Sequence, residues 1–229
     1  MKKMNDDISS YIKKSSKLLE NKNLVFFNKI QVFIKDSLPE DFDLNYVLRK
    51  IESVLPYYYV NNIDTLYIGQ FGELIERETN AAYKDGALYV TNDQDDEEDM
   101  IDDVVHEIAH AVEELAGEEI YADDKIEVEF LGKRKRLASI LKSENYDISQ
   151  YNFLDSQYSK KFDMFLYKEV GYPLMTSLTM GLFISPYAAT SLREYFARGF
   201  EEYYIGDKKY LTNVSPSVYN KIEYLDNLK

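Results

Sequence analysis

The segment His106-Glu107-Ile108-Ala109-His110 contains the only two histidines among the 229 residues of the chain. A helix brings residues four positions apart onto one face, so both imidazoles can bind the same metal ion. The carboxylate of Glu107 projects beside them, where it can take a proton from a water molecule that the metal activates. These residue types at this spacing predict metal-assisted hydrolysis. The alternative is that both histidines lie on an ordinary core helix and bond to backbone carbonyls.

The residues around this motif favour a long helix with one buried face. No glycine or proline interrupts residues 99–115, and the acidic run Asp93–Asp99 precedes them, where negative charge complements the helix dipole. We interpret that run as a solvated lead into the helix. The apolar residues follow helical spacing and form one stripe: Ile101, Val104, Val105, Ile108, Val112 and Leu115.

Two histidines do not complete a catalytic metal site, which needs a third protein ligand and an open position. Because the chain has no cysteine and no further histidine, this ligand must be Asp or Glu. Glu194 is the strongest candidate, since it lies in the first turn of a helix predicted over 190–205 and borders its apolar face. That face comprises Leu192, Tyr195, Phe196, Gly199, Phe200 and Tyr203.

Other interpretations of Glu194 remain open. Ser191 and Glu194 also form a capping box, in which the glutamate reaches back to the backbone N–H of the serine. Glu194 could equally pair with Arg198 one turn later. The remaining candidate ligands are Asp103, Glu113, Glu114, Glu201 and Glu202.

The second block resembles a motif of known zinc peptidases. Tyr187, followed seven residues later by Glu194-Tyr195-Phe196-Ala197, is similar to the second motif of the Glu-ligand peptidases called gluzincins. This group includes the catalytic domain of anthrax lethal factor, the Pro-Pro endopeptidases and the Mlc titration factor A peptidases. They combine HExxH with a later helix of the form E-[FY]-F-A and an upstream tyrosine.

The resemblance covers residues 87–115 and 185–205 and implies a role for each matching residue. His106, His110 and Glu194 would be zinc ligands, Glu107 the catalytic base and Tyr187 the partner of the oxyanion. We therefore expect a zinc-dependent endopeptidase that acts on protein or peptide substrates. The competing hypothesis is a non-catalytic zinc-binding regulatory or interaction protein on a peptidase scaffold.

Composition limits the partners of the chain. With 27 basic and 41 acidic residues the formal net charge is −14, which argues against nucleic-acid binding. The N-terminus carries charges without an apolar core of signal-peptide length, and residues 24–34 are too short to span a bilayer. We expect no membrane association and a cytoplasmic protein, or a secreted one if a leader has been removed. The short basic run Lys133–Arg136 is typical of an exposed helix face.

The chain has the pattern of an α+β protein, mostly helical, with a small early sheet and an HExxH active-site helix. We predict a helical lead segment over 1–36 and a zincin-like metallopeptidase domain over 37–229. Strands are expected at 65–69 and 87–91, the second after a tight Asp85-Gly86 turn, and it could be an edge strand that aligns a peptide or an interior strand. Helices are expected over 43–55, 123–143, 155–170, 173–183, 190–205 and 215–228.

Overall fold

The computed structural model describes residues 24–228. The chain divides into two compact units after Ala111, so the described part of the first unit is 24–111 and that of the second is 112–228. The first unit contains a sheet and the second is helical, so the predicted α+β class with mostly helical content is confirmed. Helix α4 (Glu97–Tyr121) runs through the boundary between the units and has non-helical dihedral angles at Ala116. In the described part of the chain, no helix has the length and apolar character needed to cross a membrane.

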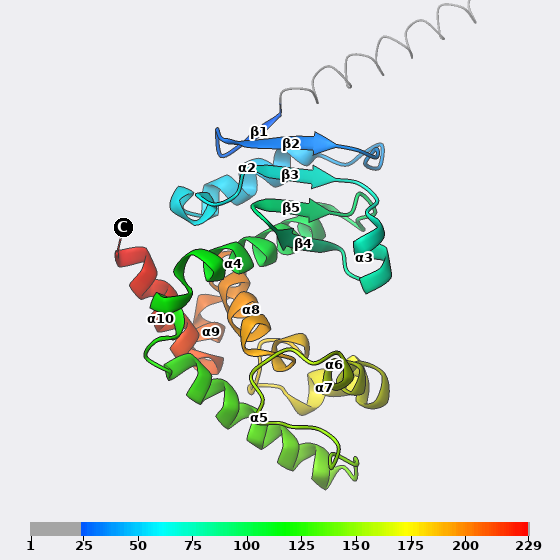
Figure 1. Cartoon of the computed structure of the whole chain (residues 1–229), viewed down its shortest axis with the longest axis vertical. Helices are drawn as coiled ribbons and strands as arrows, with labels where there is room; N and C mark the ends of the chain where they lie inside the picture. The colour runs from blue at the N-terminus through cyan, green and yellow to red at the C-terminus, as the bar shows by residue number, and fades with distance from the viewer. Residues whose placement is uncertain (1–23, 229) are drawn as a thin grey trace, which may run out of the picture. The chain divides into compact units, whose positions relative to one another are not determined.

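The first unit is built on a five-stranded sheet with the order β1-β2-β3-β5-β4. Its central strands β2 (Ile30–Ile34), β3 (Thr65–Ile68) and β5 (Ala87–Val90) run parallel, while β1 (Val25–Phe26) and β4 (Ala81–Lys84) are antiparallel edge strands. Figure 1 shows α2 and the beginning of α4 behind the strands. The buried residues that face these helices are Ile30, Val32, Leu66, Ile68, Leu88 and Val90.

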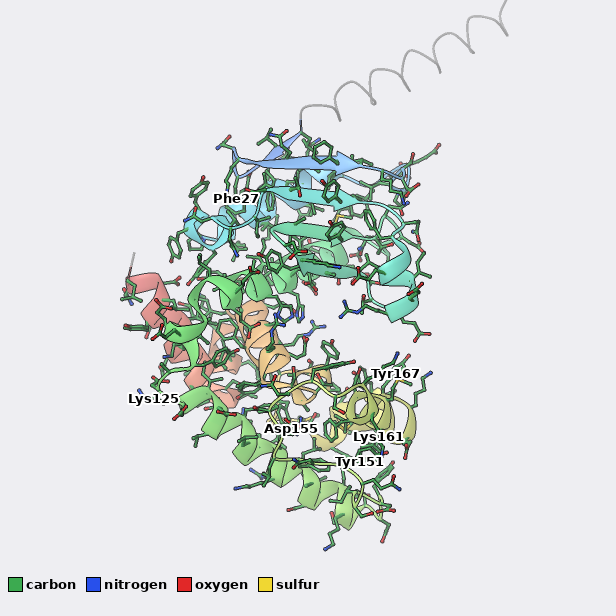
Figure 2. The ribbon with its side chains drawn as sticks, in the orientation of Figure 1. Phe27, Lys125, Tyr151, Asp155, Lys161 and Tyr167 are labelled. Carbon is green, nitrogen blue, oxygen red and sulfur yellow. The ribbon has the colours of Figure 1, made fainter. Side chains whose placement is uncertain are left out.

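The predicted helical lead segment is wrong for residues 25–34, which form a β-hairpin. Its turn contains Phe27, which is labelled in Figure 2. Phe27 and Asn28 lie in the left-handed region, with φ angles of 52° and 54°. In β2, Ile30 and Val32 are buried and Gln31 and Phe33 are exposed, which is the alternation of a strand. A short apolar stretch is compatible with both the helical and the strand periodicity, so the sequence did not distinguish the two. Pairing of this segment with β3 makes it a strand. The part of this segment before residue 24 lies outside the described residues.

The predicted Asp85-Gly86 turn is confirmed. Both residues have positive φ angles, 50° and 78°, as a two-residue turn matching the twist of a hairpin requires. This turn joins β4 to β5 with Lys84 opposite Ala87. Because β5 pairs with β3 on its other side, it is an interior strand, and the open edge belongs to β4. Strand β4 was not predicted from the sequence.

The helix predicted over 43–55 is confirmed as α2 (Leu44–Val54), where the Asp43 side chain accepts the Tyr46 N–H at the N-terminus. A 3-10 turn over Tyr57–Val60 and the short helix α3 (Gly72–Arg77) connect the strands, and neither was predicted. In this unit the helices serve mainly to cover one face of the sheet. Along α4, Val104, Val105 and Ile108 are fully buried, which confirms the predicted apolar stripe at these positions. Leu115, predicted on the same stripe, is exposed, so the prediction is wrong there.

The second unit consists of helices, most of which were predicted. They are α5 (Lys125–Ser143), α6 (Lys160–Met164), a π-helical segment (Phe165–Gly171), α7 (Tyr172–Leu178), a 3-10 turn (Tyr187–Ala189), α8 (Leu192–Tyr204), α9 (Lys208–Val214) and α10 (Pro216–Asn227). The helix expected from 155 begins only at Lys160, where Ser159 caps it, and α9 was not predicted. Helix α8 packs against α5, α9 and α10.

The exposed face predicted for Lys133–Arg136 is wrong for Arg134. This side chain is 1% exposed and Lys133 is half-buried, whereas Lys135 and Arg136 are exposed. Arg134 continues the buried stripe of α5 that contains Ile126, Phe130, Leu137 and Leu141. Its burial therefore follows from its position on the helix, and its charge is met by backbone carbonyls described below.

Candidate metal centre

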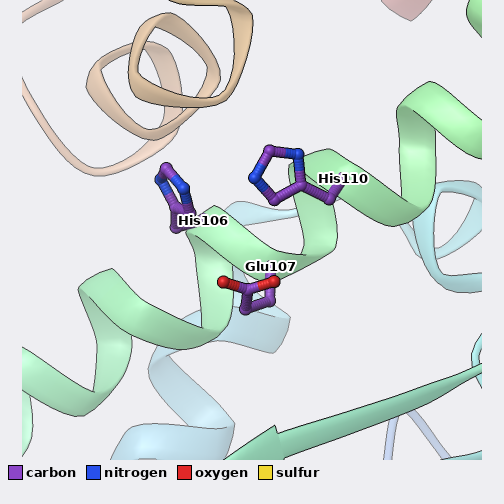
Figure 3. A group of neighbouring side chains, drawn as sticks. All are labelled: His106, Glu107 and His110. Atoms are coloured by element: carbon purple, nitrogen blue, oxygen red, sulfur yellow. The ribbon is translucent and has the colours of Figure 1, made fainter. Parts of the chain in front are cut away.

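Helix α4 brings the two histidines and Glu107 together, as the sequence predicted. One ligand atom from each of His106, Glu107 and His110 lies within 4.8 Å of the others. The two imidazole rings are 4.9 Å apart between centroids and nearly perpendicular, at 85°. Figure 3 shows the two imidazoles above the ribbon of the helix and the carboxylate of Glu107 below it. His106 is buried, and the other two side chains are half-buried.

The carboxylate of Glu107 is held by the edge strand of the sheet. Its Oε2 accepts the backbone N–H of Tyr83 in β4 at 2.6 Å. The ring of Tyr83 is fixed in turn by Asn62, whose Nδ2 donates to the Tyr83 hydroxyl at 3.0 Å and to the carbonyl of Ala111 at 2.9 Å. Strand β4 is therefore tied to the helix at both ends of the HExxH segment. Tyr83 and Asn62 were missed because these bonds join residues far apart in the sequence.

Asp103, one of the alternative ligands, has a partner in the same unit. The side chain of Gln94 donates to Asp103 Oδ2 at 3.1 Å and to the carbonyl of Thr91 at 3.3 Å. These bonds hold the segment after β5 against the second turn of α4. They give the carboxylate of Asp103 a role in shaping the start of the helix.

The other two predicted site residues, Tyr187 and Glu194, lie in the second unit. Tyr187 is in the 3-10 turn before α8, and Glu194 is in the first turn of α8, where the Ser191 hydroxyl accepts the Glu194 N–H at 3.2 Å. A capping box has two hydrogen bonds, and the one from the N–H of Glu194 to the serine hydroxyl is thus present. Burial, followed by the negative charge of Glu194, raises the pKa of Tyr187 above its ordinary value. Its phenol therefore stays protonated and can donate a hydrogen bond.

Glu113 is buried and bonded to two residues of the second unit. Its carboxylate accepts the hydroxyl of Tyr121 and, at 3.3 Å, the Nε–H of Arg193. Burial first, then the charge of Glu113 and more weakly that of Glu194, raises the pKa of Tyr121. Arg193 thus links the start of α8 to α4. The 61% exposure of its side chain limits the ion pair itself to a small contribution.

The acidic residues further along α8 have partners in the second unit. Arg198 donates to both carboxylate oxygens of Glu201 at 2.8 Å, so the cation proposed as an alternative partner of Glu194 bonds Glu201. Glu202 accepts the N–H of Asp207 at 2.9 Å, and Asp207 in turn caps α9. Both carboxylates have structural roles at these positions.

Comparison of the chain with models of known protein families, with curated protein sequences and with solved structures finds no match. A function for the chain therefore follows only from the chemistry of its side chains.

Proposed function

We propose that the protein is a zinc-dependent endopeptidase with a zincin-like active site. The observation that carries this proposal is the convergence of His106, Glu107 and His110 within 4.8 Å on one helix. Two imidazoles and an oxygen ligand suit zinc, and a chain without cysteine has no thiolate to offer. Glu107 fits the role of base better than that of ligand, because its position between the histidines is that of the base in HExxH peptidases.

Glu194 is the proposed third ligand. The preceding residue, Arg193, bonds Glu113, and Glu113 stands three positions after His110 along α4. Residues three and four apart on a helix share a face. We propose that Glu194, in the first turn of α8, supplies the carboxylate that the histidine pair lacks. Closed structural zinc sites use four protein ligands, whereas three leave a position for solvent.

The chemistry that zinc supplies when bound is Lewis acidity, which makes a water molecule more acidic and polarises the scissile carbonyl. In the proposed reaction Glu107 takes a proton from the attacking water and passes it to the leaving amine. The N–H of Tyr83 fixes one oxygen of this carboxylate and so sets its orientation toward the water. A base held in this way loses little freedom when the reaction begins.

Tyr187 is the proposed donor to the oxyanion. Its raised pKa keeps the phenol protonated, so the hydroxyl can donate as negative charge develops on the carbonyl oxygen. The same charge of Glu194 that raises this pKa would be partly neutralised by a bound cation. The phenol would still titrate well above neutral pH because burial is the larger cause.

A proteome-derived peptide library incubated with the zinc-loaded protein tests the proposal. We expect defined cleavage products with the wild type, and a decrease of about 10²–10⁴-fold in kcat/KM with Glu107→Gln. Glu118→Gln, an exposed glutamate on the same helix, is the matched control and should cleave normally. Zinc binding without any Glu107-dependent cleavage would instead support the non-catalytic regulatory protein.

A further inference from the structure

Arg134 is a charged side chain enclosed within the second unit. It is 1% exposed, and its guanidinium lies 3.9 Å from the ring centroid of Phe162, with Phe130 and Phe153 at 5.4 and 5.6 Å. Burial lowers its pKa to about 10, so it still carries its charge at neutral pH. A buried cation is costly unless other groups satisfy its hydrogen bonds. The groups that accept its hydrogen bonds indicate its role.

Those acceptors are backbone carbonyls from two separate segments. Nη1 donates to the carbonyls of Ala189 at 2.7 Å and Thr190 at 3.2 Å, and Nη2 donates to the carbonyl of Asn152 at 3.2 Å. The segment of Asn152 lies between α5 and α6, where Figure 2 labels Tyr151 and Asp155. The planar guanidinium thus joins α5 to this segment and to the turn before α8.

Ala189 and Thr190 stand between the two proposed site residues of this unit. The hydroxyl and the N–H of Thr190 both donate to the carbonyl of Tyr187, at 2.8 and 3.0 Å. On the other side, the N–H of Leu192 donates to the carbonyl of Ser156 at 2.8 Å, which fixes the start of α8. The guanidinium therefore restrains the turn at Thr190, the same residue whose hydroxyl and N–H hold the carbonyl of Tyr187.

We propose that Arg134 is a positioning residue for catalysis, whose bonds to Ala189 and Thr190 fix the Tyr187 hydroxyl relative to Glu194. This inference rests on the proposed function. It assigns Arg134 no contact with substrate or metal. Lysine cannot replace it, because a single ammonium lacks the planar fork that reaches carbonyls in two segments at once.

The first test separates positioning from stability. Arg134→Lys keeps the charge and Arg134→Met removes it, while Arg136→Met changes an exposed residue of the same basic run and serves as control. For folded Arg134→Lys we expect kcat to fall by about 10²-fold with KM nearly unchanged, since displacement of a catalytic group acts on the chemical step. Normal kcat in this variant would overturn the proposal.

A double-mutant cycle with Tyr187→Phe provides the decisive comparison. If Arg134 acts through the Tyr187 hydroxyl, Arg134→Lys should lower kcat far less in the Tyr187→Phe background than in the wild type. The same fold-decrease in both backgrounds would mean that the two residues act independently, and the positioning role would be rejected. Thermal unfolding of each variant shows whether activity follows only the folded fraction.

Amide hydrogen exchange tests the same inference without peptidase activity. Arg134→Met or Arg134→Lys should increase exchange in residues 187–195 more than along α10, whereas Arg136→Met should change neither. Unchanged exchange in 187–195 would overturn the inference even if the enzyme cleaves peptides. Increased exchange in a protein without Glu107-dependent cleavage would reject the proposed function and leave Arg134 as the anchor of the turn only.

Discussion

The two units place chemical groups in different ways. In the first unit, the three residues that converge belong to five consecutive positions of one helix, and the sheet supports that helix from one side. In the second unit, Tyr187 and Glu194 are held by bonds from α5, from the 152–156 segment and from the Ser191 cap. Local geometry places the histidine pair, whereas long-range hydrogen bonds place the tyrosine and the distant glutamate.

The interiors of the two units also differ in polarity. The buried side of the sheet is aliphatic, and the polar links of this unit to α4 include the Tyr83 N–H on Glu107, the Asn62 amide on the Ala111 carbonyl and the Gln94 amide on Asp103. The helical unit buries Arg134, Glu113 and Lys221, and each makes hydrogen bonds: Lys221 donates to the carbonyl of Glu119, and both terminal nitrogens of Arg134 are bonded, whereas the Nε of Arg134 has no partner among the described residues. The stability of a unit with a polar interior depends more strongly on precise geometry, because a displaced partner leaves a buried group without its hydrogen bond.

The largest expected effect concerns the local half of the proposed site. His110→Ala should remove bound zinc and reduce peptide cleavage to the background level, because one imidazole cannot hold the ion on this helix. Metal content after dialysis, measured by mass spectrometry, checks this loss against Glu107→Gln, which should retain zinc. Retention of a full equivalent of zinc by His110→Ala would place the metal elsewhere.

Glu194 provides the corresponding test in the second unit. Glu194→Gln should weaken zinc binding by more than the roughly 10–100-fold that loss of an outer hydrogen-bond partner causes. Competition with a chelator measures the affinity. Glu201→Gln and Glu202→Gln, whose carboxylates bond Arg198 and Asp207, should bind zinc as the wild type does. If one of them lost zinc while Glu194→Gln did not, the third ligand would have to be reassigned.

Tyr187→Phe should affect the reaction and leave the metal in place. Loss of one donor to an oxyanion lowers kcat by about 10²–10³-fold. Steady-state kinetics at saturating substrate, combined with zinc content, separate this effect from loss of the cofactor. Tyr172→Phe, which removes a hydroxyl bonded to Asp163 in the same unit, is the control and should lower kcat much less.

Substitution of two glycines by alanine separates the cost of backbone strain from the cost of crowded packing. Gly86 has a φ of +78° in the first unit, so Gly86→Ala should destabilise the protein by about 1–2 kcal/mol. Gly199 lies in α8, where an added Cβ would be 2.5 Å from Val218 Cγ1, so Gly199→Ala should cost about 1–3 kcal/mol. Denaturant unfolding measures both. A second change, Val218→Ala, should reduce the loss for Gly199→Ala and leave that for Gly86→Ala unchanged.

The smallest expected effect is a pH dependence from the polar interior of the second unit. Burial lowers the pKa of Lys133 to about 8, below its value in an unfolded chain. Between these two pKa values the unfolded state binds more protons, so the contribution of Lys133 to stability rises as the pH increases. The free energy of unfolding of the wild type minus that of Lys133→Met should therefore increase from pH 7 to pH 10. A difference that stays constant or falls would contradict the buried, charged lysine.

Part of the fold could be predicted from the sequence because its signals are local. The Asp85-Gly86 turn, the helix after Asp43 and the helical HExxH segment each depend on residues within a few positions of one another. The hairpin at 25–34 could not be distinguished from a helix, since its strand character depends on β3, which lies some thirty residues later. The burial of Arg134 could have been predicted from its position on the apolar stripe of α5.

The amino-acid sequence alone determined the proximity of His106, Glu107 and His110, because helical geometry brings neighbouring turns together whatever surrounds them. Only the tertiary structure decided that Tyr83 holds the carboxylate of Glu107 and that Arg134 anchors the turn between Tyr187 and Glu194. These bonds join positions 24 and 55 residues apart. Such partners depend on how the whole unit packs, because a buried polar group without a hydrogen bond is unfavourable and most buried polar groups are therefore paired.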